Sequence, residues 1–427
     1  MSAANRPRQV TAAVLGLWLV VLCALTAGDT GGRQSRGGVT VLATWTGAEG
    51  RAFRELLDTF TRDHGIHVDY QGTTALREVL SSEVDAGTPP DIAVLPSSGE
   101  LASYAQQNLL APLDGVLPAG RTAYGALWTP RLTAGGPVYG IAVKADLKSI
   151  VWFDRDRRRS TLPALAADGR QWCVGMGGDA TSGWPGTDWI EDLLLQQQGR
   201  SVYQDWATGG LPWTDPRVER AWRSWGSLFG MDTARTALIT DFRAAGARLF
   251  APDPPCALEH QGSFIRGGYA RPADADFVFS AGLLPRADRR STAREVSADF
   301  AAMFRGTPQA RELMRYLASA DAQRAWGSKT AGDRTHPFFA NRDVPLDAQG
   351  DDAVDRRIAT TLRDSASLCL DASDAMPTRM RLAFQRAALT YLSDTTQRPD
   401  GLLRSLEKVR QSLRGDPDQP WLSTVCG

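Results

Sequence analysis

The sequence predicts an α/β fold. Short β-branched or apolar runs at 39–44, 66–70 and 92–95 are each followed by a stretch whose apolar residues recur at helical spacing. This alternation is typical of parallel strands joined by crossover helices. With 427 residues, of which 43% are hydrophobic, the chain also has enough apolar material for two domains rather than one.

The ends of the first helices can be predicted from their capping residues. The helix after the second strand is expected to stop at Gly87, because glycine accommodates the backbone turn that ends a helix. Ser97 and Ser98 can cap the helix after the third strand. In parallel sheets a ligand binds beyond the carboxyl ends of the strands, so residues 45–49 and 96–99 are expected at the mouth of a cleft.

After the third strand and its helix, strands become fewer and most of the sequence pattern is helical. Two further strands, 138–143 and 149–153, frame a polar turn, and we place the passage to the second domain there. A strand is predicted at 172–176, followed by a Gly-rich turn and a Trp-rich helical region at 184–225. The closing third is mostly helical, with helix-like spacing at 308–318, 322–326, 380–392 and 402–413.

Residues 1–28 have the features of a targeting segment. Two arginines precede an apolar run at 10–25 that ends in small residues, so the remainder of the chain is expected to be exported. The length of the run suits either a cleaved signal peptide or a retained spanning helix. Cys23 leaves a lipid anchor as a third option, although a small residue would be usual where Leu22 stands. We expect an extracytoplasmic protein, tethered to the outer face of the cell membrane by a lipid or an uncleaved helix, with a flexible linker at 29–38.

Apart from Cys23, the exported part has four cysteines, an even number that suits two disulfides in an oxidising compartment. Three pairings are open. Cys173 with Cys256, and Cys369 with Cys426, is favoured because each bridge then closes within one half of the chain. Zinc binding is less favoured, since no C-x-x-C motif and no clustered histidines accompany the cysteines.

Composition and motifs exclude several classes of function. Lys plus Arg equals Asp plus Glu at 48 each, so no overall charge favours nucleic acid as a partner. The chain has no G-x-S-x-G, H-E-x-x-H or P-loop motif, which argues against the corresponding hydrolases and nucleotide-binding enzymes. Residues 175–180 match a loose dinucleotide fingerprint, but Gly183 and Pro185 interrupt the helix that it needs. We therefore expect no cofactor and no metal.

Eight short motifs follow one another along the chain. They are W-T-G-A-E-G at 45–50, A-G-T-P-P-D-I-A-V-L-P at 86–96, V-W-F-D at 151–154, G-W-P-G-T-D-W-I-E-D at 183–192, C-A-L-E-H-Q-G-S-F at 256–264, S-A-D-F-A-A-M-F at 297–304, R-Y-L-A-S-A-D-A-Q-R-A-W at 315–326 and D-A-S-D-A-M-P at 371–377. Each motif alone is weak, but the ordered set is specific. The chain resembles the extracellular solute-binding proteins of carbohydrate import, and is most similar to their α-glucoside-binding branch.

This resemblance implies a two-lobe periplasmic-binding-protein-like fold of type II, with a ligand cleft between lobes joined by a hinge. It implies a monomer that captures a small oligosaccharide, closes on it, delivers it to the permease subunits of an ABC importer and does no chemistry on the sugar. Lobe 1 is expected at 39–147 with 295–348 returning to it. Lobe 2 is expected at 148–294, with the helical residues 349–427 packing on lobe 2 and the hinge.

The sugar site is expected to combine aromatic faces with carboxylates, because a pyranose presents apolar C–H faces and a fringe of hydroxyls. The candidates for stacking are Trp45, Trp152 and Trp184, and those for hydrogen bonding are Glu49, Asp188, Asp299, Asp371 and Asp374. The alternative for the tryptophans is core packing. For Glu49 and Asp188 it is a carboxylate placed at a helix start, where the helix dipole favours negative charge.

Two other functions stay open from the sequence. The segment after Trp326 departs from the family pattern, with Ala331-Gly332-Asp333 and then His336-Pro337-Phe338-Phe339, which leaves the sugar, and a sensory or orphan role, undecided. A glycoside hydrolase also combines tryptophans with two carboxylates. The separation of the cleft carboxylates and the release of reducing sugar would distinguish an enzyme from a binding protein.

Overall fold

The computed structural model describes residues 37–117, 123–133, 135–329, 336–349 and 352–427. The targeting segment expected at 1–28 and most of the linker expected at 29–38 lie outside these residues. Among the helices of the described residues, none is both long and apolar enough to cross a membrane. The N-terminal anchor therefore stays a prediction.

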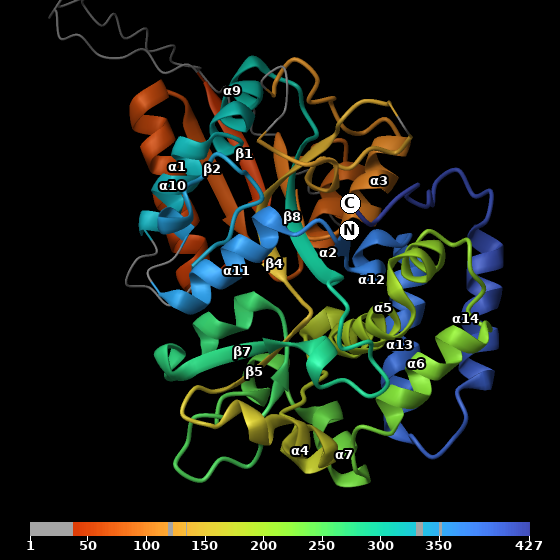
Figure 1. Cartoon of the computed structure of the whole chain (residues 1–427). Coiled ribbons are helices and arrows are strands. Elements are labelled where there is room, and N and C mark those ends of the chain that lie inside the picture. The colour runs from red at the N-terminus through yellow and green to blue at the C-terminus, as the bar shows by residue number, and fades with distance from the viewer. Residues whose placement is uncertain (1–36, 118–122, 134, 330–335, 350–351) are drawn as a thin grey trace, which may run out of the picture. The chain divides into compact units, whose positions relative to one another are not determined.

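Within the described residues, the larger of two sheets has six strands. They are β1 (Gly38–Ala43), β2 (His67–Gly72), β3 (Ile92–Leu95), β4 (Gly140–Leu147), β8 (Arg294–Met303) and β9 (Leu368–Leu370). The order is β2-β1-β3-β8-β4, with β9 beside β8. β1 pairs in parallel with β2 and β3, whereas β8 runs antiparallel between β3 and β4. Figure 1 shows β1, β2, β4 and β8 of this sheet. The three strands predicted first, and their parallel arrangement, are confirmed.

The helices between the first strands follow from their apolar faces and caps. They are α1 (Gly47–His64), α2 (Leu76–Asp85) and α3 (Ser98–Gln106). The inward face of α1 buries Phe53, Leu56 and Phe60. Ser97 caps α3, because its side chain accepts a hydrogen bond from the backbone N–H of Glu100 at 3.1 Å. The helices predicted from the sequence are therefore confirmed, including the cap.

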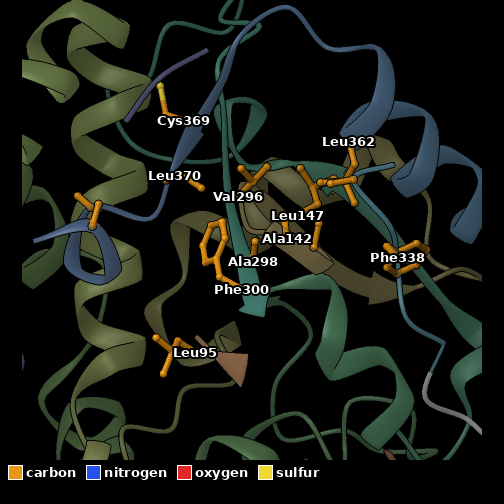
Figure 2. Packing of buried hydrophobic residues seen from close by; sticks show 14 of the residues in the cluster. Leu95, Ala142, Leu147, Val296, Ala298, Phe300, Phe338, Leu362, Cys369 and Leu370 are labelled. Atoms are coloured by element: carbon orange, nitrogen blue, oxygen red, sulfur yellow. The ribbon is translucent and has the colours of Figure 1, made fainter. Parts of the chain in front are cut away.

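β8 is central to the core of this sheet. Val296, Ala298 and Phe300 alternate along it and are buried, as a strand's period of two requires. Figure 2 shows these side chains among those of Leu147 and Leu95, which come from the neighbouring strands β4 and β3. The register pairs Leu95 with Phe300 and Leu147 with Val296. This long strand joins segments that are about 200 residues apart in the sequence.

The smaller sheet has three strands, β6 (Glu259–His260), β5 (Ile150–Asp154) and β7 (Ala275–Phe279), in the order β6-β5-β7. Both pairings are antiparallel. The predicted strands at 138–143 and 149–153 are confirmed as β4 and β5. The polar turn predicted between them is mostly wrong, because β4 continues to Leu147 and only Lys148 and Ser149 separate one sheet from the other. The domain boundaries drawn from the sequence stay a prediction.

The strand predicted at 172–176 is wrong. The segment is extended but makes only isolated bridges, from Trp172 to Leu258 and from Gly177 to Asp241. Its glycines bring it too close to residues 240–242 for a regular ladder: a Cβ on Gly175 would lie 2.8 Å from the Asp241 carbonyl oxygen. The apolar run therefore packs as an irregular segment.

The remaining described residues are mainly helical. The helices are α4 (Leu162–Ala167), α5 (Trp184–Ala207), α6 (Pro216–Gly226), α7 (Met231–Ile239), α8 (Phe242–Ala245), α9 (Pro308–Leu317), α10 (Ala320–Lys329), α11 (Ala353–Asp364), α12 (Ala372–Ala375), α13 (Thr378–Ser393) and α14 (Asp400–Leu413). The helical regions predicted in the Trp-rich segment and the closing third are confirmed. Most tryptophans fill the core: Trp206, Trp213 and Trp222 are fully buried around Phe384.

Both predicted disulfides are present. Cys173 is bonded to Cys256, and Cys369 is bonded to Cys426. The second bridge lies where residues 425–427 run beside β9, since the backbone N–H of Leu370 donates to the Val425 carbonyl at 2.7 Å. Each bridge therefore joins two segments that also contact one another through the backbone.

A buried carboxyl group in the smaller sheet predicts a pH dependence of stability. Burial raises the pKa of Glu259 from 4.5 to about 8, and the Tyr269 hydroxyl donates to its Oε2 at 2.6 Å. Between these values the folded state holds a proton that the unfolded state has released, so the free energy of unfolding should fall by about 3 kcal/mol from pH 5 to pH 8. Glu259→Gln cannot release a proton and should show a flatter urea-unfolding profile over this range. Parallel profiles for the two proteins would contradict this assignment.

Candidate functional site

A cavity of about 550 Å³ is lined by residues of the larger sheet, by helices and by the segment 264–268, which follows β6 of the smaller sheet. Trp45 and Glu49 follow β1, and Pro96 follows β3, so the ends of these parallel strands reach the cavity as predicted. Further lining comes from β4, β8, the start of α5 and the segment around α12. The volume lies within the roughly 300–1,000 Å³ range of small-molecule sites.

Seven of the eight predicted site residues line this cavity. They are Trp45, Glu49, Trp184, Asp188, Asp299, Asp371 and Asp374. Trp152 does not line it: the side chain is fully buried, its indole N–H donates to the Gln261 carbonyl at 3.0 Å, and its ring packs on Phe277. The structure therefore brings together residues that are more than 300 positions apart and leaves Trp152 in the core.

The two lining tryptophans differ in how much surface they offer. Trp45 is only 3% exposed, and its ring packs against Phe53 and Trp326 at centroid distances of 4.8 and 5.0 Å. Trp184, at the start of α5, is half-buried, with Phe242 against it at 4.8 Å. Trp184 is thus the more open aromatic surface for an apolar sugar face.

Lys144 on β4 organises the carboxylates on one side of the cavity. Its Nζ lies 2.7 Å from Glu49 Oε1, 3.7 Å from Asp146 Oδ2 and 4.0 Å from Asp299 Oδ2. Burial raises the pKa of Asp299 to about 6, against the lowering effect of the ammonium. Three carboxyl groups share one cation, which leaves oxygen atoms that can accept hydrogen bonds from ligand hydroxyls.

Lys148, just beyond β4, pairs with a second group of carboxylates. Its Nζ lies 2.6 Å from Asp188 Oδ2 and 3.2 Å from Asp371 Oδ2, and 4.9 Å from the centre of the Trp184 ring. Burial alone would raise the pKa of Asp371, but Lys148 and the backbone N–H of Asp374 hold it below its usual value. The ammonium therefore fixes two carboxylates beside the aromatic surface.

Asp374 completes this side of the cavity. Burial, and then the neighbouring charge of Asp371, raise its pKa to about 7. The Arg381 guanidinium is 3.6 Å from its Oδ1 and also contacts Glu100 at 3.2 Å. Arg381, on α13, thus connects the first turn of α3 with the segment around α12.

The charged residues Lys144, Asp146, Lys148 and Arg381 of the site are not among the candidates predicted from the sequence. Lys144, Asp146 and Lys148 are spaced two apart around an apolar strand, which places the first two on one face of β4. Such charges inside a buried strand are a signal of a polar site, but the apolar runs at 138–143 and 149–153 on either side predict a polar turn here. Arg381 carried no signal, because it lies in a helix predicted from its apolar spacing.

Comparison with known proteins gives a family match and two similar relatives. Residues 44–249 match the family described as "Bacterial extracellular solute-binding protein". The chain is 31% identical to the osmoprotective compounds-binding protein GgtB of Synechocystis, over 84% of this chain and 89% of that one. It is 29% identical to the alpha-glucosides-binding periplasmic protein AglE of Rhizobium meliloti, over 79% and 80%.

The fold is shared with solved structures. The GacH receptor of Streptomyces glaucescens, studied unliganded and with acarbose, superposes with a TM-score of 0.64 at 14% identity, over 89% of this chain and 99% of that one. At this identity the likeness concerns the fold, and it confirms the predicted two-lobe type II arrangement. The extent and identity of the match to GgtB establish the family. The chain belongs to the bacterial extracellular solute-binding proteins.

Proposed function

We propose that the cavity binds a small oligosaccharide of the α-glucoside type, and that the protein delivers it unchanged to the permease subunits of an ABC importer. The observation that carries this proposal is the half-buried ring of Trp184, which lines the cavity beside Asp188 and Asp371. An aromatic surface next to hydrogen-bond acceptors is complementary to a pyranose, which has apolar C–H faces and a fringe of hydroxyl donors.

The relatives support the ligand class. AglE is named as an α-glucoside-binding protein, and GgtB as a binder of osmoprotective compounds. A hydroxyl-rich small solute satisfies both descriptions and suits a cavity whose lysines are already paired with carboxylates. Delivery would follow from lobe closure, because ligand contacts that exist only in the closed state shift the equilibrium toward it.

Thermal unfolding with a panel of sugars tests this proposal. Maltose, trehalose, sucrose and maltotriose represent α-glucosides, and cellobiose and xylobiose are the β-linked controls. A ligand at ~100 times its dissociation constant should add about 2.7 kcal/mol to the free energy of unfolding. A response to an α-glucoside without release of reducing sugar supports import binding. If no sugar of the panel shifts the midpoint of thermal unfolding, a sensory or orphan role is favoured. Breakdown of a sugar would favour a glycoside hydrolase.

Replacing the aromatic surface should weaken sugar binding. Trp184→Ala removes the more open ring of the cavity, so we expect the dissociation constant of the responding sugar to rise at least about tenfold, which corresponds to ~1.4 kcal/mol. Titration calorimetry measures the change. Trp421→Ala is the matched control, since Trp421 is also partly buried but packs against Gly209 away from the cavity. Equal affinities of the two variants would contradict the role given to Trp184.

We further propose that the body acts as a monomer held at the outer face of the cell membrane through residues 1–28. Replacement of these residues by a cleavable signal peptide should move the protein from the membrane fraction to the soluble exported fraction, and gel filtration should give the mass of one chain. Retention in the membrane after the replacement would contradict the tether. This localisation rests on the targeting features of the sequence and is supported by membership of an extracellular family.

A further inference from the structure

Three buried carboxyl groups converge beside the cavity from separate parts of the fold. Asp188 lies on α5, Glu295 on β8, and Asp371 between β9 and α12. One carboxylate oxygen of each lies within 4.8 Å of those of the other two. Of the three, only Asp188 and Asp371 line the cavity, so the cluster extends behind it.

Glu295 is the member of this cluster whose carboxylate lacks hydrogen-bond partners among the described residues. Its side chain is 0% exposed, and neither of its carboxylate oxygens has a hydrogen-bond partner among the residues that the structure describes. Glu191, one turn after Asp188 on α5, is equally buried and has one such oxygen, while the other accepts the backbone N–H of Ala372. A buried carboxylate without donors is costly, because it loses its hydration and gains nothing in return.

The local charge is unbalanced as well. Lys148 is the cation paired with this group in the described structure, and it reaches Asp188 and Asp371 but forms no ion pair with Glu295. Four neighbouring buried carboxyl groups, Glu191 included, thus share one ammonium, which pairs with only two of them. Protons or a cation must neutralise the excess negative charge, since isolated buried charges are not tolerated in a protein interior.

We propose that Asp188, Glu295 and Asp371 bind a hard divalent cation of the Ca²⁺ class. Oxygens that are no more than 4.8 Å apart can all lie within about 2.8 Å of one ion, close to the roughly 2.3–2.6 Å that Ca²⁺ prefers. An all-carboxylate ligand set selects hard cations over softer metals. The ion provides Glu295 with the partner that Lys148 does not reach, and it links α5 with β8 and with the segment after β9.

Titration of the metal-stripped full chain with Ca²⁺ tests the site, with K⁺ at equal ionic strength as the control. We expect calorimetry to give one ion per chain, and the midpoint of thermal unfolding to rise with the logarithm of the Ca²⁺ concentration. Tb³⁺ should displace Ca²⁺ and luminesce on tryptophan excitation, because the Trp184 ring lies 4.9 Å from the Lys148 Nζ that contacts two of the ligands.

Glu295→Gln should weaken Ca²⁺ binding at least tenfold. The matched control is Glu259→Gln, which alters an equally buried carboxyl group outside the cluster and should leave Ca²⁺ binding unchanged. Glu295 does not line the cavity, so the variant should keep the thermal response to sugar, and that response shows that the variant is folded. For the same reason, the test of Ca²⁺ binding is separate from the test of sugar binding. If the variant does not fold, the Ca²⁺ titration of the metal-stripped wild type tests the proposal. Absence of Ca²⁺ and Tb³⁺ binding to the stripped wild type, or equal affinity in Glu295→Gln, overturns the proposal and leaves protons as the neutralising species.

Discussion

Lys148→Met should lower the free energy of unfolding by about 3–5 kcal/mol at pH 7. The side chain of Lys148 is buried, and its ammonium contacts Asp188 at 2.6 Å and Asp371 at 3.2 Å. Methionine has a similar length, so the substitution removes the charge with little change in packing. Two buried carboxyl groups then lose their common cation, which is the most expensive way to break a buried ion pair. Urea unfolding of both proteins at pH 7 measures the loss.

The effect of this substitution should depend on pH in a defined direction. Without the ammonium, the pKa values of Asp188 and Asp371 rise in the folded state, so lowering the pH neutralises them and should reduce the difference from wild type. Arg170→Gln is the matched control, because Arg170 is 83% exposed in its pair with Asp168, solvent screens that pair, and its loss should leave the free energy of unfolding nearly unchanged. A loss below about 1 kcal/mol for Lys148→Met would show that the carboxyl groups already hold protons at neutral pH.

The part of the fold that could be predicted is the part whose contacts are local. The strands β1 to β3 and their helices alternate along the first 70 described residues, so periodicity and capping residues such as Ser97 were sufficient to find them. β8 was not predicted as a strand. Its alanines, Ser297 and Asp299 have low strand propensity, and its stability comes from β3, β4 and β9, which are distant in sequence.

The candidate site divides in the same way, into residues that a local motif identifies and residues that only the assembled fold brings together. Trp184, Asp188 and Asp371 were found because they lie in motifs that resemble a known family, and a motif identifies residue types at fixed spacing. Trp152 lies in such a motif too, but its hydrogen bond to Gln261 depends on how β5 packs, which the spacing does not reveal. Glu295 lay outside every motif. Its proximity to Asp188 and Asp371 arises only when β8, α5 and β9 are assembled.

Removal of the Cys369–Cys426 disulfide is the second change with a large expected effect. The bridge closes a loop across a sequence separation of 57, so the loss of loop-closure entropy in the unfolded chain should contribute about 4 kcal/mol. Cys369→Ala with Cys426→Ala should therefore lower the free energy of unfolding by this amount in urea. The bridge also holds residues 425–427 beside β9, whose partner is β8. In the double variant, hydrogen exchange should accelerate at the backbone N–H of Leu370 before it does so in β1.

The free energy of unfolding lost with the Cys369–Cys426 bridge can be compared with the loss expected for the Cys173–Cys256 bridge. Its sequence separation is 83, and because closure entropy grows with the logarithm of loop length, the two bridges should differ by only about 0.3 kcal/mol. A double alanine variant at these positions should thus lose nearly the same stability, although it affects the smaller sheet and Trp172 rather than β9. Equal losses would show that both bridges act on the unfolded chain. A much larger loss for Cys369 and Cys426 would show that the folded state also depends on this bridge, because residues 425–427 then no longer protect β9 and the neighbouring Glu295 on β8 from water.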